Sequence, residues 1–527
     1  MNNILLTLLA LAPFILLLVL IVVKKIPAIK SMPFVWAVTV AITIGIWKVS
    51  FRHLSASFLK AIFTTTEIML IIFGAVLLIE VLRQKKQVAT IHNLLSSISP
   101  DARVQAIIIA WFFGALIEGI SGFGTPAALA APILVSLGFS PALSVVLSLI
   151  GNASPDSFGA AGTPILLGLS PLNLSSAEIM KITNTTALFH SIAAFAALVI
   201  ITYIVISGLG QKKRFLSLIK TLPFIFFSWL AFVIPYCLAA RFIGPELPSI
   251  AGGLIGLIVV SIAAHYKFLT PKEEIGFKNH AKKMPNFKEI AKSILPYILI
   301  IIFLGVTRIV PWVNTKLSLI SVSFTNIFGT EASYSFLPFY TPSFYFILAV
   351  LVCLVLYKST KKDISVSLKN SFNTVKFPFI ALLFTIAFVQ LLMISSYNAS
   401  SLPGIPELLA QSISSVSKNA YILISPFIGG LGGFISGSNT ASNLLFGLIQ
   451  SETAKAIGLS IILVLSLQVA GGAAGNMISI HNVIAANSVV GLKNSEGKII
   501  RKLIFASLIY MLIVGLMGFV LAKLVLF

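Results

Sequence analysis

Charged residues are scarce in this sequence of 527 residues: only 10% are Asp, Glu, Lys or Arg, while 58% are apolar. A soluble domain of this length needs far more polar surface, so a mean hydropathy of +1.04 excludes that class. Cysteines are scarce as well. Cys237 and Cys353 lie within apolar runs and have neither the spacing of a disulfide framework nor that of a zinc site. The composition therefore predicts an all-α polytopic membrane protein.

The sequence also lacks the motifs of membrane-embedded enzymes. There is no His-Glu-x-x-His, no Asp-rich motif and no Gly-x-Ser-x-Gly. Nothing predicts a metal or another cofactor, and the polar residues gather instead at breaks within apolar segments. We therefore expect a transport protein and not an enzyme.

Basic residues outnumber acidic ones, with 37 Lys and Arg against 15 Asp and Glu, for a net charge of +22. In a soluble protein this excess would suggest nucleic acid, but here the basic residues fall in short loops between apolar runs. Such loops orient a protein in its membrane. They predict a cytoplasmic loop at 267–292, an external loop at 311–340 and a multi-pass protein of the bacterial plasma membrane, with lipid around it and no nucleic-acid partner.

Two stretches share a glycine-interrupted design. Residues 111–132 read WFFGALIEGISGFGTPAALAAP, and residues 426–447 read PFIGGLGGFISGSNTASNLLFG. Without gaps, Ser121 falls on Ser436, Gly122 on Gly437 and Thr125 on Thr440, each 315 positions apart. A second polar break follows in each half, at 151–164 and at 468–482. We expect roughly 12 transmembrane helices plus re-entrant hairpins or broken helices. They would form two inverted repeats, 1–266 and 293–527, on either side of the basic loop.

Glycine-interrupted segments at matching places in two halves indicate the substrate site of a transporter. The alternative is close helix packing, which accounts for the glycines but not for the Ser, Thr and Asn residues beside them. A half-helix that begins at such a break offers unpaired N–H groups and the positive end of its dipole, which suits a small carboxylate. Unwound carbonyl groups could equally hold sodium. The predicted substrate-binding residues are Ser121, Gly122, Phe123, Gly124, Thr125, Asn152, Ser436, Gly437, Ser438, Asn439, Thr440 and Asn443.

Two intramembrane acids are candidates for proton coupling. Glu118 precedes the first break and Asp156 lies within the second. Desolvation favours the protonated form of an acid at this depth. The alternatives are helix capping or interfacial exposure for Glu118 and a turn for Asp156. His190 is interpreted as a satisfied bundle histidine, and Arg241 either as a partner of Glu246 or as an attractor of substrate.

Several motifs, in the right order, resemble those of the bacterial L-lactate permeases. Glu118 to Pro126 resembles EGxxGFGxP, Phe242 to Pro248 reproduces FIGPELP, and Gly437 to Phe446 is similar to G-S-D-T-S-S-N-x-x-F. Asn152 to Pro164 and Ala470 to Ser479 resemble two further stretches of that family. The likeness covers nearly the whole chain. It implies import of L-lactate, with D-lactate or glycolate as further substrates, by proton symport.

The chain departs from that pattern at three positions. Asn439 stands where the family has Asp, Asp156 where it has Val, and Asn476 where it has Lys. One acid is missing and another has appeared, so our hypothesis is that Asp156 takes over part of the proton-carrying role. The oligomeric state is not predicted.

The triplet Ser438-Asn439-Thr440 is also similar to the SNT motif of sodium-coupled dicarboxylate carriers. That likeness implies an elevator-type motion of two inverted repeats. It keeps sodium-coupled carboxylate or dicarboxylate transport open as the alternative function, and the same breaks could line an anion channel.

Overall fold

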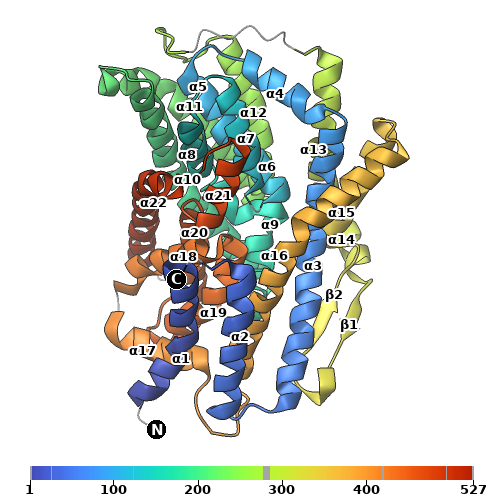
Figure 1. Ribbon diagram of the computed structural model, residues 1–527, viewed down its shortest axis with the longest axis vertical. Helices are drawn as coiled ribbons and strands as arrows, with labels where there is room; N and C mark the ends of the chain where they lie inside the picture. The colour runs from blue at the N-terminus through green and yellow to red at the C-terminus, as the bar shows by residue number, and fades with distance from the viewer. Residues whose placement is uncertain are drawn as a thin grey trace.

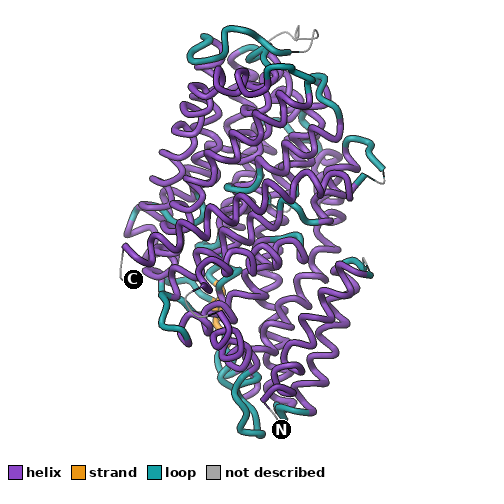
Figure 2. The backbone as a smooth tube through the Cα atoms, turned by 90° about the vertical axis from the view of Figure 1, so that its left-hand side faces the viewer, coloured by secondary structure: helices purple, strands orange, loops and turns teal. Residues whose placement is uncertain are grey.

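The computed structural model describes residues 3–24, 26–122, 124–276, 285–417, 420–493 and 495–524. The described chain is a bundle of helices with a small antiparallel sheet of β1 (Val322–Phe324) and β2 (Tyr334–Phe336), in which Val322 pairs with Phe336 (Figures 1 and 2). Ten helical segments of the described residues are long and apolar enough to cross a membrane. Five shorter apolar helices accompany them. The predicted all-α polytopic fold is confirmed.

Long helices form the outer part of the bundle, and four of those described, α3, α10, α13 and α16, begin at a residue whose side chain caps the helix. Ser175 and Glu178 form a capping box at the start of one helix, and Thr360 and Asp363 form one at the start of another. The bounds are α1 Asn3–Leu18 (continued by the π-helical turn η1, Val19–Val23), α2 Ala28–Gly45, α3 Phe51–Gln84, α10 Ser176–Gly208, α11 Arg214–Phe242, α12 Pro248–His265, α13 Phe287–Ile309, α15 Pro342–Leu356, α16 Lys361–Ile394 and α22 Glu496–Leu524. The shorter α4 (Gln87–Ser97) and α14 (Pro311–Ser318) join these helices.

The first broken element is a buried span that stops at mid-depth and turns back. The helix α5 (Ala102–Ala106), the π-helical segment η2 (Ile107–Phe113) and α6 (Gly114–Ser121) run without interruption. The chain then reverses, and α7 (Thr125–Ser136) follows. Gly122 and Gly124 adopt φ angles of +59° and +76° in this turn. Glycine reaches that region without the steric cost that a side chain would add, so the turn explains both residues.

The second half contains a hairpin of the same kind. Its helices are α18 (Tyr421–Ser436) and α19 (Asn439–Ala456), and α17 (Ile405–Ser417) precedes them. Gly437, in the turn, has a φ angle of +68°. The helices α6 and α18 end at Ser121 and Ser436, 315 positions apart, which is the offset of the sequence match.

The next element in the first half is unwound over several residues. The helix α8 (Pro141–Gly151) leads into the 3₁₀ turn η3 (Pro155–Phe158) and then α9 (Gly159–Leu166), after which the 3₁₀ turn η4 (Ser170–Leu172) leads to α10. Within α9, the residues Ala160, Ala161 and Gly162 have φ angles of 43°, 52° and 80°. Three successive left-handed residues interrupt the helix, and two of them carry the steric cost of a Cβ atom.

In the second half the corresponding break is shorter than the predicted element at 468–482, and it lies after the glycines of that element. The helix α20 (Ile461–Asn476) continues through Gly471, Gly472 and Gly475, and α21 (Ile480–Val489) begins after a break at 477–479. These glycines permit close packing on α18. A Cβ atom on Gly471 would lie 2.0 Å from the Pro426 carbonyl oxygen, and one on Gly475 would lie 1.8 Å from that of Gly430.

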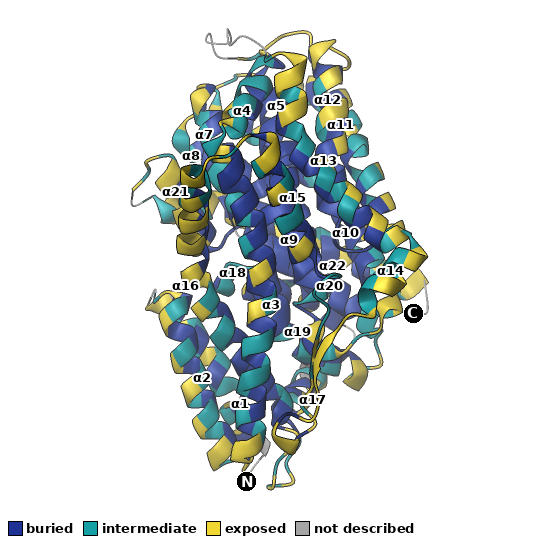
Figure 3. Cartoon of the chain, turned by 90° about the vertical axis from the view of Figure 1, so that its right-hand side faces the viewer, coloured by how far each residue is buried: buried dark blue, intermediate teal, exposed yellow. Residues whose placement is uncertain are grey.

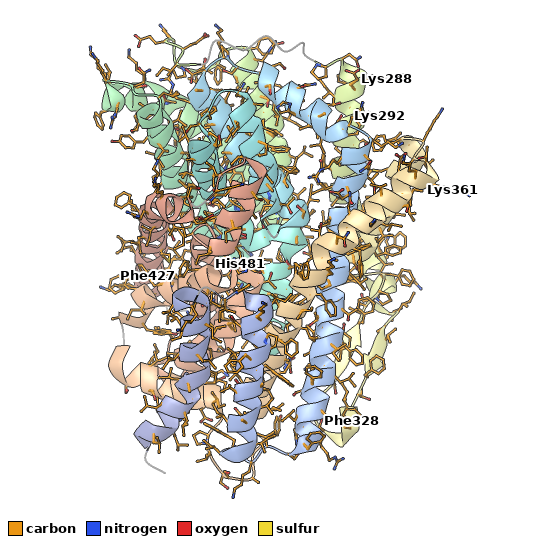
Figure 4. The ribbon with its side chains drawn as sticks, viewed as in Figure 1. Lys288, Lys292, Phe328, Lys361, Phe427 and His481 are labelled. Atoms are coloured by element: carbon orange, nitrogen blue, oxygen red, sulfur yellow. The ribbon has the colours of Figure 1, made fainter. Side chains whose placement is uncertain are left out.

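The two hairpins approach the centre of the molecule from opposite ends. In Figure 1, α5 and α7 lie in the upper half and α19 in the lower half, while α9, α20 and α21 lie between them. Figure 3 shows the buried residues concentrated along this central axis. Lys288, Lys292 and Lys361 lie in the upper half of Figure 4, Phe328 near the bottom and His481 near the centre. The fold thus places the breaks of both halves together at mid-depth.

Candidate functional site

Residues of both halves enclose a small cavity where the breaks meet. Its empty volume is about 230 Å³. The lining comprises two acids, several amides and hydroxyl groups, and the unwound backbone of α9. The lining residues are Glu118, Gly122, Asp156, Gly159, Ala160, Thr163, Pro164, Gly437, Ser438, Asn439, Thr440 and Asn476. Seven of the fourteen residues predicted for binding or proton coupling are among them.

The two acids of the cavity are in contact with one another. The side chains of Glu118 and Asp156 are 1% and 4% exposed, and each interacts with the other and with a neighbouring amide. The buried atoms Oε2 of Glu118 and Oδ2 of Asp156 receive no hydrogen bond from a donor group of the described chain. A proton on either carboxyl group makes the contact a hydrogen bond, whereas two ionised carboxylates would repel each other.

A chain of amides connects Asp156 to the second half. Asn476 donates a hydrogen bond of 2.8 Å from Nδ2 to Oδ1 of Asp156, and its own Oδ1 accepts one of 2.8 Å from Nδ2 of Asn482. Asn482 in turn lies against the first hairpin, because a Cβ atom on Gly124 would be 2.9 Å from its Oδ1 atom. The amides thereby connect Asp156 through α20 and α21 to the first hairpin.

Asn439 belongs to a second buried chain. Its Nδ2 atom donates to Oγ of Ser157 at 3.2 Å and to the Val469 carbonyl at 3.0 Å. Ser157 is 2.7 Å from Nε2 of His190, and Nδ1 of His190 is 2.5 Å from the hydroxyl of Tyr510. Both ring nitrogens of His190 therefore have partners, as in a satisfied bundle histidine.

Two further polar residues of α19 bridge to α9. The hydroxyl groups of Thr440 and Thr163 are 3.4 Å apart. Asn443 donates from Nδ2 to the Pro164 carbonyl at 2.8 Å, and its Oδ1 accepts from Gln468. Asn443 therefore holds the two halves together and does not line the cavity.

The remaining predicted residues lie around the cavity. Ser121 donates to Ile117 within its own helix, and Ser436 donates to Gly432 and Ser438 within the turn. Asn152 contacts Glu118 but does not line the cavity. Gly124, in the turn, and Thr125, the first residue of α7, do not line the cavity, and Phe123 lies outside the described residues.

Arg241 is not the partner of Glu246. Arg241 is exposed, and Glu246 instead forms a buried ion pair with Arg308 of α13, with Nε and Oε1 separated by 2.7 Å. The two side chains are 4% and 5% exposed. The sequence contains no signal for this pair, because the two residues are 62 positions apart and belong to different helices.

The cavity combines donors for an anion with acids that would oppose it. The first N–H groups of a helix have no acceptor within the helix, and Asn439 and Thr440 begin α19 at the cavity wall. None of the described lining residues is a lysine, arginine or histidine. An anion can therefore bind beside Glu118 and Asp156 at low electrostatic cost only when protons neutralise these acids.

Several lining residues were missed by the sequence-based prediction. Thr163, Gly159 and Ala160 lie within the predicted break at 151–164, from which only Asn152 and Asp156 were selected. Asn476 was noted as a departure from the family pattern and not as a site residue. All three departures, Asp156, Asn439 and Asn476, line this one cavity.

These features define a class: a polytopic membrane protein with broken helices that enclose a polar site at mid-depth, as in secondary transporters. The L-lactate permease family model matches residues 6–525, so the chain belongs to the L-lactate permease family. It is a multi-pass protein of the bacterial plasma membrane.

The chain is similar over most of its length to several known proteins. The chain is 34% identical to a protein of Haemophilus influenzae that is provisionally named an L-lactate permease, over 96% of this chain and 97% of that protein. It is 26% identical to the glycolate permease GlcA of Escherichia coli, over 85% and 83% of the two chains. Among solved structures, it is similar to the YdaH transporter of Alcanivorax borkumensis, with a TM-score of 0.44, 12% identity and coverage of 86% of this chain and 85% of that chain.

Proposed function

We propose that the protein is a secondary active transporter that imports L-lactate, and with it D-lactate or glycolate, together with protons. The observation that carries the proposal is the contact between Glu118 and Asp156 in a cavity whose described lining has no cationic side chain. The negative charge of a carboxylate substrate is repelled by these acids unless protons neutralise them. Occupancy by substrate and by protons is then coupled through simple electrostatics.

The substrate class follows from the donors around the cavity. The N–H groups at the start of α19 would take the carboxylate, and the hydroxyl groups of Thr163 and Thr440 would pair with the 2-hydroxyl group. Lactate and glycolate share this 2-hydroxy acid unit, and relatives of both names are among the proteins to which the chain is similar.

Proton coupling is also energetically sufficient. Moving a monoanion inward against a negative interior costs about 2.3 kcal/mol per 100 mV. One co-transported proton cancels that charge, so the pH gradient and the substrate gradient remain to drive uptake. We assign the transported proton to the pair of Glu118 and Asp156.

We further propose that an elevator-type shift of the hairpin helices exposes the site alternately to the two sides. The two hairpins meet the cavity from opposite ends, and their tips, at Gly122 and Gly437, lie against α9 and α21. Cross-linking between α19 and the outer helices α3 and α16 in the presence and absence of substrate would test this motion.

The test of the function is uptake of labelled L-lactate into proteoliposomes under an imposed inward pH gradient. Accumulation above the external concentration, competition by glycolate and independence from sodium are expected. A passive channel would equilibrate lactate without accumulating it. If uptake required sodium and succinate competed best, the proposal would be wrong.

Sodium-coupled carboxylate transport is the second candidate. Two ionised carboxylates together with the unwound carbonyl groups of α9 offer oxygen ligands for a hard cation. The same vesicles separate the two mechanisms. An inward sodium gradient without a pH gradient should not drive uptake if protons are the coupling ion.

A further inference from the structure

A second and larger cavity lies on the side of the molecule that the loop charges assign to the outside. It contains about 1390 Å³ of empty space and is bounded by the segment 243–246 after α11, the start of α10, the end of α13 and the loop before α15. Ser176 and Ser335 line it and are exposed, so the cavity is open to solvent. The proposed import function does not use it.

This cavity reaches the central site directly. Thr163 lines both cavities, and its hydroxyl group is 3.4 Å from that of Thr440. The wall between them is backbone: a Cβ atom on Gly162 would lie 2.6 Å from the carbonyl oxygen of Pro245. A solute in the outer cavity is therefore one residue away from the predicted substrate site.

Arg308 is the one cationic residue among the described residues that line the outer cavity. Nε donates to Glu246 at 2.7 Å, Nη2 to the Tyr340 carbonyl at 2.8 Å and Nη1 to the Thr307 hydroxyl at 3.4 Å. A guanidinium group has five N–H donors, so two of them have no acceptor among the described residues. Its Cζ atom lies over the Tyr340 ring, 3.7 Å from the ring centroid, which adds a cation–π contact.

We propose that the outer cavity is a first binding station for the transported carboxylate, with Arg308 as the residue that binds it. This inference rests on the proposed import of a small carboxylate. One N–H group on each of Nη1 and Nη2 remains to donate to the oxygens of a carboxylate. Asn314, which also lines the cavity, adds a neutral donor for the hydroxyl group of a 2-hydroxy acid.

The acids around Arg308 set the strength of this station. Glu246 balances the guanidinium charge along one edge and keeps the cation in place. Glu67, whose Oε2 atom accepts a hydrogen bond of 2.8 Å from Tyr334, lines the same cavity and opposes an anion when ionised. A station that passes its ligand on must bind weakly, since a tight site would hold the ligand back. Opposing charges at Arg308 and Glu67 provide this balance.

The test uses an accessible reporter at the mouth of the cavity. In the full-length protein with the substitution Ser335→Cys, a membrane-impermeant maleimide is added from outside, and L-lactate is expected to slow labelling. The natural Cys237 and Cys353 are replaced by Ser in every variant. Removal of the pair by Arg308→Gln together with Glu246→Gln leaves no unpaired buried charge and should raise the half-protecting lactate concentration about tenfold or more.

Two further variants give the sign and the location of the effect. Glu67→Gln removes a negative charge and should lower the half-protecting concentration, opposite to the double variant. Asn439→Ala alters the central cavity and should leave protection at Ser335→Cys intact. Protection that survives the double variant but disappears with Asn439→Ala, or the absence of protection in every background, would overturn the station.

Uptake of L-lactate into proteoliposomes under an inward pH gradient separates this inference from the proposed function. If the unaltered protein failed to take up L-lactate, the proposed function would be refuted, whereas protection by glycolate or succinate that depends on Arg308 would still support an anion station. Uptake of L-lactate without any protection by L-lactate would refute the station alone.

Discussion

Asn476 of α20 donates a hydrogen bond of 2.8 Å to the carboxyl group of Asp156, and so joins the second break of each half. These are two of the three positions at which the chain departs from the lactate permease pattern, and the third, Asn439, lines the same cavity. The three departures therefore lie close together in the structure, around one cavity. An amide that donates to an acid keeps the acid oriented without adding a fixed positive charge.

The first prediction concerns Asp156→Asn. The substitution keeps the shape of the side chain but removes one titratable group, so lactate accumulation under a pH gradient should fall about tenfold or more, equivalent to about 1.4 kcal/mol. Exchange of labelled for unlabelled lactate needs no net proton movement and should be retained. Unchanged accumulation would refute a role of Asp156 in proton coupling.

The second prediction concerns Glu118→Gln. The amide can still reach Asn152 and Asp156, yet it cannot release a proton, so the variant should exchange lactate but not accumulate it. Its thermal unfolding should remain close to that of the parent protein. If Glu118→Gln accumulated lactate normally while Asp156→Asn did not, the transported proton would belong to Asp156 alone.

The third prediction tests the fit between the acid pair and the unwound segment. A Cβ atom on Gly159 would lie 2.2 Å from Oε1 of Glu118, so Gly159→Ala must displace the acid. Overpacking of this kind costs about 1–3 kcal/mol, and uptake should be lost. Gly497→Ala is the matched control, because no atom lies within 4 Å of its added Cβ atom. Equal uptake by the two variants would show that Glu118 is not held against this segment.

The fourth prediction concerns the stability of the protein and the ion pair at the start of α5. Arg103 and Asp101 form a buried ion pair, 1% and 3% exposed, and Asp101 also accepts from the N–H of Ile275 at 3.0 Å. Arg103→Ala leaves the acid buried without its partner and should lower the free energy of unfolding by about 3–5 kcal/mol. Thermal unfolding of the purified protein, followed by tryptophan fluorescence, measures the change.

An exposed ion pair next to this site, between Lys220 of α11 and Glu273 of the loop after α12, provides the control for Arg103→Ala. Lys220 donates to Glu273 at 2.8 Å, and this hydrogen bond lowers the pKa of the Glu273 carboxyl group. The contribution of a lowered carboxyl pKa is present at neutral pH and lost as the pH falls through the folded-state value. Since both groups are exposed to solvent, Lys220→Ala should change unfolding little at any pH. A similar loss in both variants would mean that the loop contact, and not the buried charge, matters.

The sequence was informative where a local rule determines the structure. The turn at Gly122 and Gly437 could be located because a positive φ angle favours glycine, and because Ser, Thr and Asn accompany it in both halves. The apolar runs predicted the membrane-spanning helices because length and hydropathy are also local properties of the sequence. Contacts such as that between Glu118 and Asp156 follow from the way α6 and η3 pack, which no local pattern encodes.

Glycine alone was ambiguous. Gly471, Gly472 and Gly475 resemble a break in the sequence, yet they lie within α20 and allow its backbone to touch that of α18. Close packing and helix interruption both require the absence of a side chain, so composition cannot separate them. A polar residue beside a break need not line the cavity either: Asn443 bridges α19 to α9, and Ser121, Thr125, Asn152 and Ser436 also lie outside the lining.

The contact between α18 and α20 has a consequence for changing what the protein carries. Each helix meets the other through bare backbone, so almost any larger residue at Gly429, Gly433, Gly471 or Gly475 would force the pair apart. Natural or laboratory selection for new substrates has little freedom there. Variation should instead accumulate on α9 and at the start of α19, where Thr163, Asn439 and Thr440 can be exchanged while the frame that holds them stays unchanged.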